Sequence, residues 1–585
     1  MRKTLTKAEA NNLKGDHIVI PFGYEKIGKS AFKNRRDIES IVIPDGVKSI
    51  GDYAFSACGN LNMIDVPDSV VQIGEGAFDN FKDLFICCSN PSFAFDYCRK
   101  NNITMETANE ITIPDGATSI DDTEFCYRED IESIRIPESV EKIDGTEFDF
   151  CYGLKEINVD ENNKYFSSMN GILYDKSMKT LISYPAGIES KFFTVPDCVT
   201  SIGSFVFRGC ESLLHINLSS GVSDIGNTTF MYCTNLTSIN ACGENQHFSS
   251  INGVLFDKNK ETLICHPSKI KNYFYSIPDG VKRIAPNAFW ECKNLEDIRI
   301  PESVESIGNS AFVFCHGIKI IDIPCGVRSI DSEAFSCNEN LTHIIIPAGV
   351  SSIDEGVVSF CDNLISIDVN ECNQNYFSTD GVLFDKNKKT LICYPAGIDN
   401  DSYAIPDGVT SIGAYAFSAC KNLINIYIPD SVANIGDTAF SSCENLKYIK
   451  IPAGVTSIKE ATFASCKSLT HIIIPTSVTS IEDSAFIGCE NLNVIQIPDS
   501  VTSIGEDVFT NCNENLTVYC SRNSHAYTYC QENEIHIKAK LSDKTLSEIS
   551  ELIADGFFHF LRAKRIEKQI IADYPDMSTP SGRSS

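Results

Sequence analysis

The stretch SIGAYAFSACKNLINIYI, residues 411–428, recurs with small changes along the whole chain. Two close copies are SIGDYAFSACGNLNMIDV at 49–66 and SIEDSAFIGCENLNVIQI at 480–497. The copies share the pattern L-x-x-I-x-I-P-x-x-V-x-x-I-G-x-x-A-F-x-x-C-x-x-L. Self-similarity at a fixed period indicates a solenoid, in which each unit buries its apolar face only against its neighbours.

The period of this pattern is 23 residues, which separates Pro429 from Pro452 and Pro452 from Pro475. The I-x-I segment alternates like a strand and ends at Pro, which has no N–H to donate to a neighbouring strand. Stacked copies would form a parallel sheet with about 4.8 Å between coils. We expect A-F-x-x-C to return the chain as a turn of α-helix or 3₁₀-helix. The sequence therefore predicts an α/β solenoid with a parallel β-sheet face.

Three intervals between the repeated prolines are longer than a multiple of 23 by 36 residues. The extra elements lie near 160–195, 242–277 and 370–405, and they contain Asn170-Gly171, Asn252-Gly253 and Asp380-Gly381. Such pairs favour the type I′ turn of a two-residue hairpin, and the flanking segments alternate like strands. We therefore predict three β-hairpin insertions.

A different pattern appears twice, at 85–105 and 518–537, and the second copy stands where the repeats stop. Because the last coil of a solenoid has an open apolar end, the second copy is predicted to be a cap. The first copy then suggests a seam between an N-terminal array at 1–105 and a main solenoid at 106–537. Residues 538–573 are predicted to form an amphipathic helical segment, because apolar residues recur in them every three or four positions. Residues 574–585 are predicted to form a disordered tail.

The formal net charge is −29, from 78 acidic and 49 basic residues. This balance repels phosphate backbones, so we expect no nucleic-acid partner. Neither a secretory leader nor an apolar stretch long enough for a transmembrane segment is recognised, which favours a cytoplasmic location.

Cysteine is the first residue type to consider for chemistry, since the chain has 25. Twelve occupy one position of the coil: Cys58, Cys151, Cys210, Cys233, Cys292, Cys315, Cys361, Cys420, Cys443, Cys466, Cys489 and Cys512. We expect them to be small buried core residues. Disulfides elsewhere, such as Cys520 with Cys530, stay open. Neither a zinc-binding cysteine pattern nor a nucleophile signature is found, so we expect no metal, no cofactor, no catalytic residue and no enzyme activity.

The repeat resembles the BspA-like subtype of the leucine-rich repeat superfamily, whose units read IPxxVTSIGxxAFxxCxxLxx, over roughly residues 15–537. The resemblance implies a parallel-sheet solenoid that binds protein partners without catalytic machinery. It also implies a surface or secreted protein with an adhesion role, so the location stays open between the cell surface and the cytoplasm.

On the predicted strands the residues between the buried positions face outward. The later coils place polar, aromatic and aliphatic groups there, and Tyr is enriched at binding hot spots. The predicted ligand-binding residues are Asn425, Tyr427, Tyr448, Lys450, His471, Ile473, Val494 and Gln496. The alternative functions are an intracellular scaffold or regulator and a carbohydrate-active solenoid enzyme. The C-terminal helical segment could fold back on the solenoid end, or contact a partner or membrane through Phe557, Phe558 and the basic residues Arg562, Lys564 and Arg565.

Overall fold

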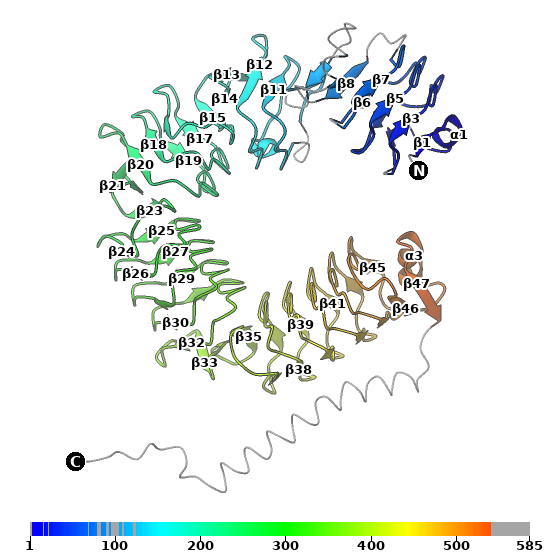
Figure 1. Ribbon diagram of the computed structural model, residues 1–585. Coiled ribbons are helices and arrows are strands. Elements are labelled where there is room, and N and C mark those ends of the chain that lie inside the picture. The colour runs from blue at the N-terminus through cyan, green and yellow to red at the C-terminus, as the bar shows by residue number, and fades with distance from the viewer. Residues whose placement is uncertain are drawn as a thin grey trace, which may run out of the picture. The chain divides into compact units, whose positions relative to one another are not determined.

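The computed structural model describes residues 3–15, 17–21, 23–67, 69–78, 84–88, 93–94, 97, 105–107, 110–120 and 125–539. The chain divides into two compact units. The first unit comprises residues 1–235 and 242–247, and the second comprises 236–241 and the chain from 248 onward. In Figure 1 each unit is a stack of short coils with strands at equivalent positions of successive coils. The predicted solenoid is confirmed.

Two kinds of strand build each coil of the first unit. The strands of the I-x-I segment are β2 (His17–Val19), β4 (Ser40–Val42), β6 (Met63–Asp65), β8 (Phe85–Cys88), β9 (Met105–Thr107), β10 (Glu110–Thr112), β11 (Ser133–Ile136), β12 (Glu156–Val159), β16 (Phe192–Thr194) and β18 (His215–Leu218). Shorter strands precede the A-F-x-x-C segment: β1 (Thr4–Leu5), β3 (Lys26–Ile27), β5 (Ser49–Ile50), β7 (Gln72–Ile73), β17 (Ser201–Ile202) and β19 (Asp224–Ile225). The insertion strands are β13 (Phe166–Met169), β14 (Ile172–Asp175) and β15 (Thr180–Ser183), and the helices are α1 (Lys7–Ala10) and the 3₁₀-helix η1 (Thr146–Phe148).

The second unit repeats this plan. Its I-x-I strands are β20 (Ser238–Ala241), β24 (Phe274–Ser276), β26 (Asp297–Arg299), β28 (Ile320–Asp322), β30 (His343–Ile346), β32 (Ser366–Val369), β36 (Ser402–Ala404), β38 (Asn425–Tyr427), β40 (Tyr448–Ile449), β42 (His471–Ile473), β44 (Val494–Gln496), β46 (Thr517–Cys520) and β47 (His536–Ala539). Its shorter strands are β25 (Arg283–Ile284), β27 (Ser306–Ile307), β29 (Ser329–Ile330), β31 (Ser352–Ile353), β37 (Ser411–Ile412), β39 (Asn434–Ile435), β41 (Ser457–Ile458), β43 (Ser480–Ile481) and β45 (Ser503–Ile504). The insertion strands are β21 (Phe248–Ile251), β22 (Val254–Asp257) and β23 (Thr262–Cys265), then β33 (Tyr376–Thr379), β34 (Val382–Asp385) and β35 (Thr390–Cys393), and the helix is α3 (His525–Glu532).

Successive coils pair in parallel with a shift of one repeat, so that identical positions meet. Ser306 lies opposite Ser329, and His471 lies opposite Val494. The repeated phenylalanines form a buried ladder, in which the rings of Phe417 and Phe440 stack at 5.2 Å and those of Phe440 and Phe463 at 5.5 Å. Such ring pairs add about 0.5–1.5 kcal/mol each beyond the burial of their area. The residues that recur in every repeat are therefore those whose side chains pack between coils.

The A-F-x-x-C segment is not the helical turn that the sequence predicts, except for η1 among the described coils. In the coil at 411–428, Tyr415 and Ala419 both have φ of 57°, in the left-handed region that interrupts a right-handed helix. The N–H groups of Tyr415, Phe417 and Ala419 donate to carbonyls of the following coil at 2.8–3.0 Å. The segment is therefore a series of turns whose hydrogen bonds run between coils.

Eleven of the twelve ladder cysteines are buried as predicted, and Cys512 is half-buried. Their thiols also form hydrogen bonds that the repeat pattern does not predict. The Cys466 thiol donates to the Phe440 carbonyl of the preceding coil at 3.2 Å, and the Cys58 thiol donates to Phe32 at 3.0 Å. Where Asn338 replaces Cys, its amide donates to the carbonyls of Phe312 and Phe335 at 2.9 and 2.8 Å. Both residue types therefore place a buried donor at this position.

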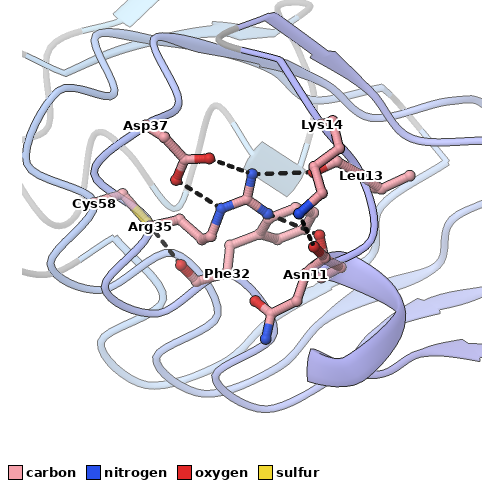
Figure 2. A network of polar contacts seen from close by, with 8 residues as sticks. Asn11, Leu13, Lys14, Phe32, Arg35, Asp37 and Cys58 are labelled. Carbon is pink, nitrogen blue, oxygen red and sulfur yellow. Dashed lines mark hydrogen bonds and ion pairs between the residues drawn. The ribbon is translucent and has the colours of Figure 1, made fainter.

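The first coil of the array carries Arg35 in place of the ladder cysteine. Its guanidinium donates to both carboxylate oxygens of Asp37, each at 2.7 Å, and to the carbonyls of Ala10 and Leu13 at 2.8 and 3.1 Å. Figure 2 shows Arg35 between Asp37 and Leu13. Hydrogen bonds from Arg35 hold the pKa of Asp37 below its usual value. Because α1 ends at Ala10, Arg35 satisfies carbonyls at the end of the helix that begins the solenoid.

The three hairpins are present, and their turns have the predicted geometry. Asn170 and Gly171 have φ of 53° and 77°, and Asp380 and Gly381 have φ of 51° and 78°, as a type I′ turn requires. Each 36-residue element is also a coil in its own right. In the third element β35 pairs with β37, and the Tyr394 ring stacks on Phe417 at 5.3 Å.

A buried asparagine begins each insertion at the position that Val holds in regular coils. These residues are Asn163, Asn245 and Asn373, and each is 0% exposed. The Asn373 amide donates to the carbonyls of Pro347 and Val350 at 2.8 and 3.0 Å. Its oxygen accepts from the backbone N–H groups of Asn375 and Tyr376, both at 2.8 Å. One side chain therefore ties the insertion to the coil before it.

The repeats of the second unit end in a strand–helix–strand unit made of β46, α3 and β47. Thr517 pairs with His536, and the Tyr529 ring meets Phe509 edge-on at 6.2 Å, at the end of the aromatic ladder. Cys520 and Cys530 are free thiols, so the disulfide left open between them is absent. The helical segment and tail predicted beyond residue 539 lie outside the described residues.

Candidate interaction surface

The eight predicted binding residues lie on or next to four strands of the second unit, which belong to two sheets, β36-β38-β40 and β42-β44-β46-β47. Asn425 and Tyr427 lie on β38, and Tyr448 and Lys450 lie on β40 and just after it. His471 and Ile473 lie on β42, opposite Val494 and Gln496 on β44. The parallel register therefore places them in two columns that run across the strands.

The accessibility of these residues is uneven. Lys450 is exposed, and its ammonium lies 3.2 Å from a carboxylate oxygen of Asp430 at the rim of the sheet. The other residues are half-buried except Gln496, which is 6% exposed and offers a partner almost no surface. Its neighbours in register are Ile473 and Tyr519, so long side chains flank it on both sides.

His471 contributes polarity to this surface without a charge at neutral pH. Burial lowers the pKa of its imidazole below the usual value of about 6.5. Its Nδ1 lies 2.9 Å from the Thr470 hydroxyl. Lys450 is therefore the one permanent charge among the eight predicted residues.

The same columns extend beyond the predicted residues in both directions. The register carries them to Ser402 and Ala404 on β36, to Thr517 and Tyr519 on β46, and to His536 and Lys538 on β47. None of these outward positions between Ser402 and Lys538 holds Asp or Glu. We call this set of outward residues on β36, β38, β40, β42, β44, β46 and β47, with Lys450, the acid-free strip.

The earlier strands of the second unit differ in charge. Their outward positions include Asp297, Asp322 and Asp368. They also hold the more exposed apolar residues Phe274, Ile320 and Ile345, at 53%, 55% and 41%. Sequence reasoning missed Tyr519, His536 and Lys538 because the cap breaks the repeat, although the segment TVYC at 517–520 shows the same alternation.

No group of three or more His, Cys, Asp or Glu in the described part of the chain could hold a metal ion. Of the helices described, none is long and apolar enough to span a bilayer.

Comparison with known proteins identifies the repeat family. A family model described as "BspA type Leucine rich repeat region (6 copies)" matches residues 9–109, 91–189, 184–273, 265–381 and 396–516. A leucine rich cell surface protein from Faecalibacterium prausnitzii is 28% identical, with 64% of this chain and 98% of that chain covered and a TM-score of 0.42. The pneumococcal vaccine antigen PcpA is 20% identical, with 65% and 99% covered and a TM-score of 0.42.

A leucine-rich repeat protein from Eubacterium ventriosum is 19% identical, with 81% of this chain and 91% of that chain covered and a TM-score of 0.29. The search of curated proteins gave no significant match. The family model covers most of the chain, over the residues that hold the 23-residue coils. The chain therefore belongs to the BspA-type leucine-rich repeat family.

Proposed function

We propose that the chain is a non-catalytic interaction module that binds a protein partner through the acid-free strip, in the manner of a surface or adhesion protein. The observation that carries the proposal is the segregation of charge. The chain has a net charge of −29, yet the strip has no carboxylate from Ser402 to Lys538. Since most protein partners also carry carboxylates, the strip is where such a partner meets the least repulsion.

The side chains of the strip suit protein recognition. Tyr427, Tyr448 and Tyr519 are half-buried, so they are partly held in place before a partner binds. Rigid aromatic groups at the centre of an interface typically contribute about 2 kcal/mol or more each when they are buried by the partner. Multiple small contacts along a stiff array would then add up to specificity.

The test is a pull-down with the full chain and the double variant Tyr427→Ala/Tyr448→Ala as baits. The matched control is Ile320→Ala/Ile345→Ala, which removes exposed apolar groups from the outward positions of β28 and β30, outside the strip. Partners that bind the strip should be lost with the first variant and kept with the control, while both variants melt at the wild-type temperature. Equal recovery by a folded Tyr427→Ala/Tyr448→Ala chain would exclude the strip as the binding surface.

The adhesion role and the scaffold role differ in location. Protease treatment of intact cells should cleave an adhesion protein and spare an intracellular scaffold. A carbohydrate-active enzyme would need clustered carboxylates, and the strip offers none for that chemistry.

A further inference from the structure

The cap of the second unit contains a cavity that the repeats and the proposed function leave unused. Its volume is about 550 Å³, and its walls come from the last coil, from α3 and from β47. Phe509, Leu516 and Cys530 form an apolar floor, since all three are buried. Glu514 and Glu534 lie on its rim, and both are exposed. The cavity therefore combines an apolar floor and an acidic edge with the polar side chains of Asn513, Gln531 and His536.

The first array contains a matching cap, and there the chain itself covers the open end. In that cap β8 pairs with β9 at the same offset of 19 residues, Ile86 with Met105, as Thr517 pairs with His536 at the C-terminal cap. The Tyr97 ring meets Phe78 edge-on at 6.1 Å, as Tyr529 meets Phe509. After β9 the chain continues into β10, which contacts β9. The end of the first cap is thus covered by the segment that comes directly after it in the sequence.

In the C-terminal cap β47 is the edge strand of its sheet, and it ends at Ala539, beside the cavity. The chain continues for 46 residues, from Lys540 to Ser585. Within them Leu546, Ile549, Ile553 and Phe557 recur at steps of three or four, which is an apolar helical stripe. Arg562, Lys564, Arg565 and Lys568 follow against a single acid, Glu567. An apolar stripe next to a basic cluster complements an apolar floor with an acidic rim.

We propose that residues 546–568 of the chain's own tail dock on this cavity, with the apolar stripe on the floor and the basic cluster against Glu514 and Glu534. The docked segment shields the apolar end of the solenoid, as β10 covers β9 in the first array. The same basic cluster could be attracted to anionic lipid, but the acidic rim is part of the same chain and is present at high effective concentration.

The test is zero-length carbodiimide crosslinking of the full chain, followed by peptide mass spectrometry. A docked tail should give amide links between Glu514 or Glu534 and Lys564 or Lys568. A mixture of ¹⁵N-labelled and unlabelled chains separates links within one chain from links between two chains. Links found only between chains would overturn the proposal in favour of a second copy as the occupant.

Charge reversal then tests the specificity of the contact. In Glu514→Lys/Glu534→Lys the protection of α3 and β47 against hydrogen exchange should fall by roughly 3- to 10-fold, because exposed ion pairs are individually weak. Adding Lys564→Glu/Lys568→Glu should restore the protection, whereas the control Glu490→Lys, on another exposed turn, should leave it unchanged. Hydrogen-exchange protection of α3 and β47 that stays the same in both charge-reversal variants would overturn the proposal. So would a tail that gives no crosslink in solution and binds only to phosphatidylserine vesicles.

Discussion

The buried Asn373 gives a sharp test of how the insertions are held. Regular coils carry Val at this position, so a consensus-guided design would replace the asparagine by valine. The structure predicts that Asn373→Val destabilises the third insertion, although it restores the repeat. The Asn373 side chain makes four hydrogen bonds to backbone groups and is 0% exposed.

The size of the effect depends on the groups that lose their partner. The carbonyls of Pro347 and Val350 are bound in buried surroundings, and an unsatisfied buried polar group costs roughly 1–3 kcal/mol. The N–H groups of Asn375 and Tyr376 are half-buried, so water can replace part of what they lose. The added burial of Val offsets about 1–2 kcal/mol. The net loss should be about 3 kcal/mol, or roughly 100-fold in the local opening equilibrium.

Hydrogen exchange measures this opening coil by coil, which suits an array whose stability is a sum of neighbour contacts. Amides of β33 and β34 should exchange roughly 100-fold faster in Asn373→Val, while those of β42 and β44 keep their wild-type rates. Gln374→Ala, at an exposed neighbouring position, is the matched control and should change little. Unchanged exchange in the hairpin of Asn373→Val would refute the reasoning.

Three further outcomes are expected. Burial lowers the pKa of His266 to about 4, so the unfolded chain binds more protons than the folded chain between pH 6.5 and 4. The free energy of unfolding should therefore fall by about 3 kcal/mol as the pH falls through this window. The variant His266→Tyr, which introduces the residue that the other two insertions carry, should remove this loss when urea unfolding is compared at pH 4.5 and 7.5. Phe463→Ala removes a ring that is 0% exposed and stacks on Phe440 and Phe486, and should cost about 3–5 kcal/mol, seen as faster exchange in the adjoining coils. Cys466→Ala removes the thiol donor of the Phe440 carbonyl, which keeps its hydrogen bond from the Cys443 N–H at 3.2 Å, and should cost about 0.5–1.5 kcal/mol, whereas Cys466→Ser should recover part of it in the same measurement.

The repeat predicted the strands because period and alternation report directly on which side chains are buried. Ile412 and Leu423, for example, are at most 1% exposed. The A-F-x-x-C turn was predicted wrongly because its left-handed residues, such as Tyr415 and Ala419, are not the glycines that usually signal this conformation. Their strain is compensated by hydrogen bonds to the next coil, which a single repeat cannot reveal.

The donor role of the ladder cysteines had a signal in the sequence, since Asn338 is too polar for a site that needs only volume. The asparagines of the insertions had a similar signal in their recurrence. Outward-facing positions are harder to judge. Alternation predicts that Gln496 points away from the core, but it does not report how far neighbours such as Tyr519 close over it.

Two of the hairpin turns are also sites at which asparagine deamidation is expected. In Asn170-Gly171 and Asn252-Gly253 a side-chain amide precedes a residue without a side chain. At this sequence asparagine most readily releases ammonia to form a succinimide, which water then opens to aspartate or isoaspartate. The third hairpin already carries Asp380-Gly381 with φ of 51° and 78°, within a few degrees of the values at the other two turns. Conversion of either asparagine to aspartate would therefore add a negative charge to its hairpin tip and leave the turn in a conformation that the molecule already uses.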